Sequence, residues 1–131
     1  YPDTETFCFY NANPHNRFTT DCVIRAISAA ADIPYNQVVM ELAELQCKTG
    51  YDDGESKLYG KYLESKGWIK CKQPRKADNT KYTGKEFCKL VPWGKRYIAH
   101  IGGHHIAAII SGQVWDTWDC TDGCIGNYWT K

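Results

Sequence analysis

Residues 102–119, "GGHHIAAIISGQVWDTWD", contain two adjacent histidines, a Ser-Gly turn and an acid on the far side of that turn. A carboxylate beside an imidazole fixes the tautomer of the ring and stabilises its protonated form, as a catalytic base requires. The same pair of side chains can instead hold a hairpin together without any chemical role. The two interpretations differ in whether a nucleophile elsewhere in the chain reaches one of the histidines.

The register of the hairpin decides which histidine meets the acid. With residues 111–112 as a two-residue turn, Ala107 pairs with Asp116. Side chains alternate between the two faces of a strand, so His105 shares a face with Asp116 and is its diagonal neighbour. We therefore predict His105 as the base and Asp116 as the acid that orients it. The alternatives that stay open are His100 and His104 as the base and Asp119 as the acid.

Cys22 is the candidate nucleophile. Apolar residues at helical spacing predict a helix over about 21–31, which places Cys22 in the first turn. The partial positive charge at a helix N-terminus lowers the pKa of a thiol, and a protonated histidine nearby lowers it further. Backbone N–H groups at the same helix end can stabilise an oxyanion. The surroundings predicted for Cys47, Cys71 and Cys88 favour structural roles.

Three other side chains complete the predicted site. Asn16, six residues before Cys22, is placed to donate a second hydrogen bond to the oxyanion. Thr20 or Asp21 can cap the helix, and Asp21 is also a candidate for substrate binding. Trp118, opposite His105 in the hairpin, is the best candidate for shielding the site and contacting substrate. Trp93 and Trp115 are weaker candidates, since aromatic residues at this density are more often core.

The order Cys22, His105, Asp116 resembles that of the papain-like cysteine peptidases, which carry a cysteine on an early helix and a histidine and an Asn or Asp on later strands. The local pattern is most similar to that of the peptidases that cleave bacteriocin leader peptides after a double glycine. The chain also resembles small papain-like proteins that phages encode. The matching blocks are Asn16 with Asp21-Cys22, and "HIAAI" from His105 with Asp116.

This resemblance implies a papain-like fold and amide hydrolysis through a thioester. Three positions depart from the pattern of those leader peptidases. Asn16 stands where those leader peptidases have Gln, Val23 where they have Gly, and Thr117 where they have Pro.

The elements that must position these residues follow from apolar periodicity and from turn residues. Helices are predicted first and strands second, in one domain over 1–131 of class α+β with an antiparallel sheet. The helices are predicted over about 21–31, 34–49, 55–66 and 83–90, and the strands over about 67–73, 96–102, 104–110 and 113–119. Residues 124–130 are predicted as an edge strand, and residues 1–20 as loop with one short strand at most.

Composition narrows the function classes. A net charge of +1 argues against a nucleic-acid partner, and no apolar run approaches the roughly 20 residues that span a bilayer. Seven scattered cysteines favour free thiols and a cytoplasmic location. Cys120 and Cys124 have the spacing of half a zinc site, but no second pair of ligands matches, so we expect no metal and no cofactor.

Three hypotheses remain. The leading one is a peptidase or amidase acting on a peptide or protein. The second is a deamidase or a transglutaminase-like acyltransferase that uses the same thioester. The third is a binding protein that keeps the fold without catalysis.

Overall fold

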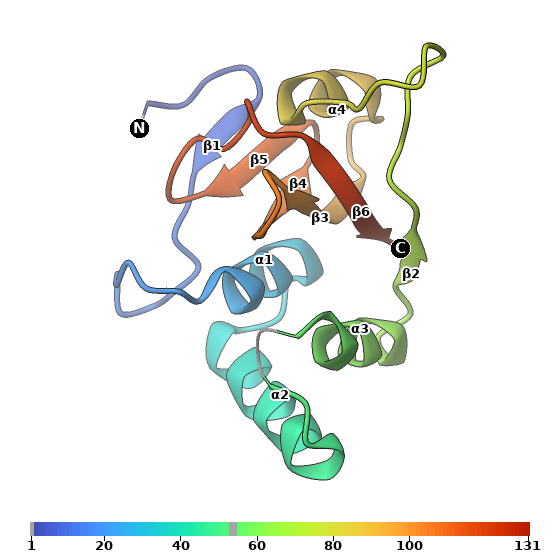
Figure 1. Ribbon diagram of the computed structural model, residues 1–131. Coiled ribbons are helices and arrows are strands. Elements are labelled where there is room, and N and C mark those ends of the chain that lie inside the picture. The colour runs from blue at the N-terminus through green and yellow to red at the C-terminus, as the bar shows by residue number, and fades with distance from the viewer. Residues whose placement is uncertain (1, 53–54) are drawn as a thin grey trace.

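A computed structural model describes residues 2–52 and 55–131 of the chain (Figure 1). It shows a mixed α+β structure, with three helices before the main run of strands, as the sequence predicts. Within these residues the elements are β1 (Phe7–Phe9), α1 (Cys22–Ala31), α2 (Tyr35–Thr49), α3 (Ser56–Ser65), β2 (Ile69–Cys71), α4 (Gly84–Leu90), β3 (Arg96–Ile101), β4 (His105–Ile110), β5 (Gln113–Asp116) and β6 (Ile125–Thr130).

The strands of the described chain form one sheet in the order β1-β5-β4-β3-β6-β2. The sheet is mixed, because β1 pairs with β5 in parallel while the other pairs are antiparallel. The prediction of a wholly antiparallel sheet was therefore wrong. The prediction of 124–130 as an edge strand was also wrong, since β6 lies between β3 and β2. Nothing in either segment's own sequence distinguishes an edge from an internal position, because the neighbours come from distant parts of the chain.

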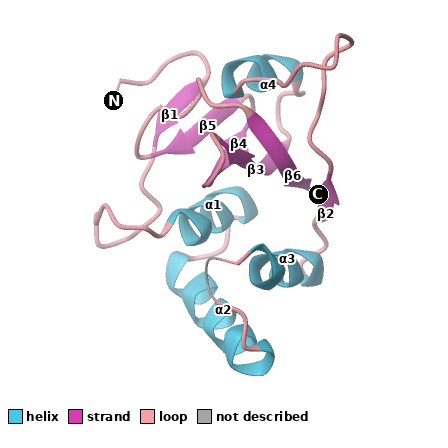
Figure 2. Ribbon diagram, viewed as in Figure 1, coloured by secondary structure: helices cyan, strands magenta, loops and turns pink. Residues whose placement is uncertain are grey.

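Helices cover both faces of the sheet (Figure 2). Helices α1, α2 and α3 lie on one side, where Ile27, Leu58 and Leu63 pack with Ile98 and Ile106 in one apolar cluster. On the other side α4 contributes Phe87 and Cys88 to a second cluster, which contains Ile101, Ile109 and Val114 from the sheet. Because helices cover both faces of the sheet, the side chains on both faces of β4 are buried. The sequence Ile106–Ile110 is therefore a continuous apolar run and does not alternate between apolar and polar residues.

The start of α4 packs directly against the segment that follows β5. A Cβ on Gly84 would lie 2.7 Å from Cδ1 of Ile101 and 2.9 Å from Cα of Thr121. Both distances are below normal contact, and the backbone of Thr121 cannot rotate away as a flexible side chain would. Glycine is therefore required here for the close approach of α4 to the residues around Cys120.

We predict that Gly84→Ala lowers the free energy of unfolding by about 1–3 kcal/mol, because the extra methyl group overpacks this contact. Urea denaturation of the variant and of Lys85→Ala checks this. Lys85 lies next to Gly84 in α4 and is exposed, and its side chain forms a surface ion pair with Asp122, so its replacement should cost less than about 1 kcal/mol. Equal stability of Gly84→Ala and the natural chain would contradict the prediction.

Two further findings concern the chain as a whole. All seven cysteines lie within the described residues, and each is a free thiol. Among the described helices, none combines the length and the apolar character that a membrane crossing requires.

Candidate active site

The β4–β5 hairpin has the register predicted from the sequence. Ile110 pairs with Gln113 across a turn at residues 111–112, both of which have positive φ angles of 49° and 75°. Positive φ at both central residues is typical of the type I′ turn that matches strand twist. His105 begins β4 and Asp116 ends β5, and Nε2 of His105 lies 2.5 Å from Oδ2 of Asp116. The predicted His–Asp contact is therefore present.

Arg25 lies on the other side of Asp116. Its Nη1 donates to Oδ1 of Asp116 at 2.5 Å, and its Nε donates to Oδ1 of Asp21 at 2.8 Å. Arg25 and Asp116 are both buried. A buried charge is tolerated only when it is paired and hydrogen bonded, and here one guanidinium satisfies two carboxylates. The three side chains thus tie the first turns of α1 to the end of β5.

Asp21 is committed to this network. Its Oδ2 accepts hydrogen bonds from the Tyr35 hydroxyl at 2.6 Å and from Nδ2 of Asn13 at 3.2 Å, while Oδ1 accepts from Arg25. Burial works against the charge, but the bonds from Tyr35 and Arg25 outweigh it and lower the pKa of Asp21. With both oxygens engaged, Asp21 positions Arg25, and its geometry gives no support to the predicted role in substrate binding.

Cys22 is the first residue of α1 and is half-buried. Asp21 occupies the N-cap position, but within the described chain its side chain makes no cap hydrogen bond, which leaves the first N–H groups of the helix available. Burial alone would raise the pKa of the Cys22 thiol. The hydrogen bond to His105, the backbone N–H of Ile106 and the charges of His105 and Arg25 together lower it.

His105 interacts with both Cys22 and Asp116. Burial favours its neutral form, yet hydrogen bonds to Asp116, Cys120 and Cys22 and the charge of Asp116 raise its pKa to about 11. The pKa of Asp116 is lowered, since the bond and charge of His105 outweigh the effect of burial. Because Nε2 faces Asp116, Nδ1 is the ring nitrogen left for the thiol. At neutral pH the arrangement favours a thiolate–imidazolium pair.

Cys120 is a second thiol in the same cluster. It is buried, and its Sγ lies 3.9 Å from Oδ2 of Asp116. Burial outweighs the opposing bond to His105 and raises the pKa of Cys120, so this thiol is the less reactive of the two. One ligand atom each from His105, Asp116 and Cys120 lie within 4.8 Å of one another, a spacing at which a divalent cation could be held. The guanidinium of Arg25 on Asp116 disfavours a cation there by charge repulsion.

Asn16 makes no hydrogen bond to Cys22, His105 or Asp116 within the described residues. It lies in an exposed turn with φ 55°, and its N–H donates to the carbonyl of Asn13 at 3.0 Å. In the described part of the chain its side-chain amide has no hydrogen-bond partner. A second oxyanion donor from Asn16 therefore stays a prediction.

The alternative histidines have other surroundings. His104 lies in the exposed turn before β4. His100 on β3 has its Nε2 2.6 Å from the hydroxyl of Tyr59, and burial lowers its pKa, so it is neutral. Tyr59 also interacts electrostatically with Cys22, because burial and the charge of Cys22 raise the pKa of Tyr59 to about 12. Its hydroxyl stays protonated and can donate a hydrogen bond.

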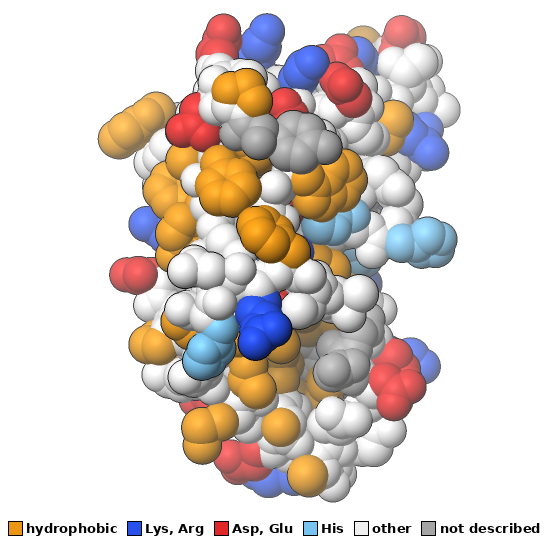
Figure 3. Space-filling model, turned by 90° about the vertical axis from the view of Figure 1, so that its left-hand side faces the viewer, with side chains coloured by type: hydrophobic (Ala, Val, Ile, Leu, Met, Phe, Trp, Pro, Cys, Tyr) orange, Lys and Arg blue, Asp and Glu red, His pale blue; other side chains and the backbone are white. Residues whose placement is uncertain are grey.

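Figure 3 shows large hydrophobic side chains beside a histidine on one face of the molecule. The Trp118 ring is 4.9 Å from the His105 ring and remains 42% exposed. Trp118 and His105 line a cavity of about 160 Å³ together with Cys120. Trp115 packs against Tyr10 instead, and Trp93 is 87% exposed. Of the three tryptophans considered from the sequence, Trp118 is the one in contact with His105.

Sequence reasoning missed Arg25 and Tyr59, and it considered Cys120 only as a zinc ligand together with Cys124. A signal for Arg25 existed, because it is the only charged residue in the helix "CVIRAISAAA" and lies three residues after Cys22, on the same helix face. No local signal marked Tyr59, or the position of Cys120 beside Asp116.

Comparisons of the chain with protein families, with curated proteins and with solved structures found no match.

Proposed function

We propose that the protein is a cysteine peptidase or amidase that hydrolyses a peptide or protein substrate through a thioester on Cys22. The observation that carries the proposal is the continuous chain of contacts Cys22–His105–Asp116–Arg25, with Cys22 at an uncapped helix N-terminus. A thiol with a lowered pKa, an imidazole with a raised pKa and a buried carboxylate are the three groups that thioester chemistry requires.

In the first half-reaction the Cys22 thiolate attacks the carbonyl carbon, and a C–S bond forms while the oxygen becomes an oxyanion. Backbone N–H groups at the start of α1 are placed to stabilise that charge. When the C–N bond breaks, the His105 imidazolium gives its proton to the leaving amine. A water molecule then attacks the thioester and His105 takes a proton from it. Cleavage of the C–S bond releases the acid and restores the thiolate–imidazolium pair.

A papain-like fold is part of the proposal. Its support is a nucleophile helix that packs on a sheet whose successive strands carry the histidine and the acid, in the chain order Cys22, His105, Asp116. The free state of all seven cysteines supports the further proposal of a reducing, cytoplasmic compartment.

The test is iodoacetamide labelling from pH 5 to 9, followed cysteine by cysteine with mass spectrometry. We expect Cys22 to react fastest below pH 7, and Cys120 and Cys88 to react slowly because burial raises the pKa of each. His105→Ala should lower the labelling rate of Cys22 at acidic pH to that of an ordinary thiol. The matched control is His104→Ala, which removes the exposed neighbouring histidine and should leave the labelling rate of Cys22 unchanged.

A Cys22 that labels no faster than the exposed Cys47 would contradict the catalytic proposal. A non-catalytic binding role would then be the better account. If Cys22 is reactive, an activated ester offered with and without an added amine separates hydrolysis from acyl transfer, because the thioester then partitions between water and the amine.

A further inference from the structure

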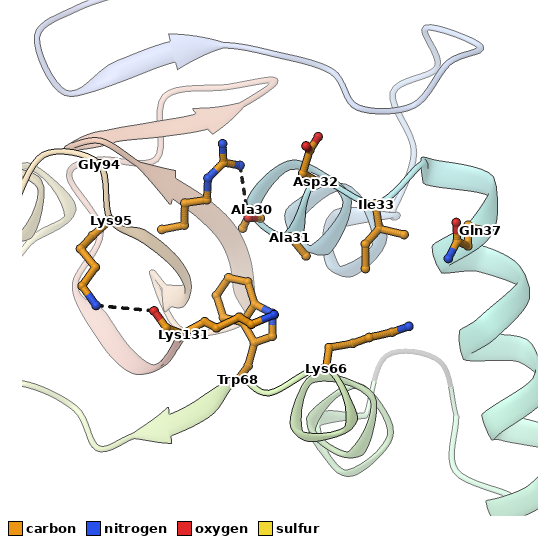
Figure 4. A pocket seen from close by; sticks show the side chains of 11 residues that line it. Ala30, Ala31, Asp32, Ile33, Gln37, Lys66, Trp68, Gly94, Lys95 and Lys131 are labelled. Carbon is orange, nitrogen blue, oxygen red and sulfur yellow. Dashed lines mark hydrogen bonds between the residues drawn. The ribbon is translucent and has the colours of Figure 1, made fainter.

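We propose that a pocket at the C-terminal end of α1 binds a small molecule that carries at least two phosphate groups. The pocket has a volume of about 650 Å³, within the range of about 300–1,000 Å³ that is typical of small-molecule sites. It lies between the last turn of α1, the start of α2, the end of α3 and the start of β3 (Figure 4). This ligand site is separate from the proposed catalysis.

The pocket is remote from the catalytic cluster although α1 contributes to both. Cys22 is the first and Ala31 the last residue of this ten-residue helix, and Ala31 lines the pocket. At a rise of about 1.5 Å per residue their backbones are about 14 Å apart. A bound ligand at this end therefore does not occupy the space next to Cys22.

Charge is the first reason to expect a phosphate ligand. The lining includes four cationic side chains and a single acid, Asp32, for a net charge of +3. The four cations are Lys66, Lys95, Arg96 and Lys131. A lone carboxylate brings one negative charge, whereas a phosphate ester brings about 1.5 to 2, so a ligand with two phosphates matches this excess.

Only one of these cations is paired with an acidic side chain. Lys66 forms an ion pair with Glu41 at 3.4 Å, and Nζ of Lys95 donates to the main-chain oxygen of Lys131 at 3.5 Å (Figure 4). Across the described residues no Asp or Glu side chain lies within ion-pair distance of Lys95, Arg96 or Lys131. Arg96 uses Nη1 to donate to the carbonyls of Ala29 and Ala30, which neutralises the negative end of α1. Its remaining N–H donors on Nε and Nη2 are available to a ligand.

The start of α2 adds to the positive potential. Pro34 is the N-cap of this 15-residue helix, and among the described residues it receives no side-chain cap. Gln37 in the first turn lines the pocket, so the positive end of the α2 dipole lies at its wall. The lysine side chains and the N-terminus of α2 thus both make the electrostatic potential in the pocket more positive.

The apolar part of the lining allows more than bare phosphate. Ala30, Ile33 and Trp68 supply apolar parts of the lining, and Figure 4 shows Trp68 and Lys131 among the side chains around the pocket. A pocket with an apolar wall and a cationic rim suits a molecule with an apolar or ring portion and an anionic group. A nucleoside diphosphate has this composition, and inorganic pyrophosphate has the anionic part alone.

The experiment is calorimetric titration of the full chain with ADP, pyrophosphate, adenosine and a hexaglutamate peptide. We expect ADP or pyrophosphate to bind, with adenosine and the peptide at least tenfold weaker. Tighter binding of ADP than of pyrophosphate would identify a nucleotide-type ligand, and equal binding an inorganic polyphosphate. No binding of either phosphate compound would overturn the proposal, and so would equal binding of adenosine or of hexaglutamate.

A pair of charge-matched variants locates the site. The double variant Lys95→Gln/Lys131→Gln should raise the Kd for the phosphate ligand at least tenfold. The double variant Lys61→Gln/Lys72→Gln removes the same charge from exposed positions outside the pocket and should change the Kd less than twofold. Equal weakening by both would show general charge attraction and overturn the proposal. Cys22 labelling in the same samples reports on the catalytic proposal independently.

Discussion

Asp116→Asn is expected to slow iodoacetamide labelling of Cys22 at pH 6 at least tenfold. Asparagine keeps the shape of the side chain but removes the charge that, with the hydrogen bond, raises the pKa of His105. Burial then favours the neutral imidazole and moves the pKa of His105 below its ordinary value, so at pH 6 Cys22 loses much of the neighbouring positive charge that lowers its own pKa. An ordinary thiol with a pKa of about 8.5 has well under ~1% thiolate at pH 6.

The measurement is the labelling rate of each cysteine from pH 5 to 9. Cys88 is an internal control for folding, because it is 4% exposed and becomes reactive only if the chain opens. Asp119→Asn is the matched control, since Asp119 is the other acid near the end of the hairpin and accepts hydrogen bonds from Thr121 instead. A pH profile unchanged by Asp116→Asn, or shifted equally by Asp119→Asn, would show that Asp116 does not control the thiol.

Arg25→Met is expected to lower the free energy of unfolding by about 3–5 kcal/mol, because it leaves two buried carboxylates without their shared cation. The side chains of Arg25, Asp21 and Asp116 are only 9%, 8% and 2% exposed, so solvent cannot replace the lost bonds. Methionine keeps the length and packing of the arginine stem. A loss of this size is a large part of the total stability of an ordinary domain.

Urea denaturation of the variant and of a matched control measures the effect. The control is Lys48→Met, which breaks an ion pair with Glu44 in which both side chains are more than two-thirds exposed, and which should cost less than about 1 kcal/mol. Adding Asp21→Asn to Arg25→Met should recover part of the loss by removing one uncompensated charge. Equal costs for Arg25→Met and Lys48→Met would refute the buried network.

The pH dependence of stability has a definite sign. The pKa values of Asp21 and Asp116 are lower in the folded chain than in the unfolded one. The two carboxylates therefore contribute to the free energy of unfolding above the unfolded pKa of about 4, and this contribution is lost as the pH falls through the folded pKa values. The natural chain should therefore lose stability on acidification below about pH 4. In Arg25→Met, protonation of Asp21 and Asp116 removes two unpaired buried charges and so stabilises the folded state. The difference in the free energy of unfolding between this variant and the natural chain should therefore narrow in acid.

The parts of the site that are close together in sequence were predictable. The hairpin turn at 111–112 sets the register over a few residues, and strand alternation then brings His105 to Asp116. Likewise the apolar spacing after Thr20 predicts a helix whose first turn contains Cys22. These elements depend on local backbone geometry and on period, which a single sequence displays directly. The chemistry that one would assign to Cys22, His105 and Asp116 follows from those elements alone.

The contacts that join these elements were decided only by the tertiary structure. Arg25 and Asp116 are 91 residues apart, and no periodicity specifies that a helix packs so that its arginine meets that acid. The same holds for Cys120 beside His105, for β1 parallel to β5 and for β6 inside the sheet. Such pairings depend on which apolar faces cover which others across the whole chain. Sequence by itself determined the reactive residue types and their local order, whereas packing decided the buried charges that set their pKa values.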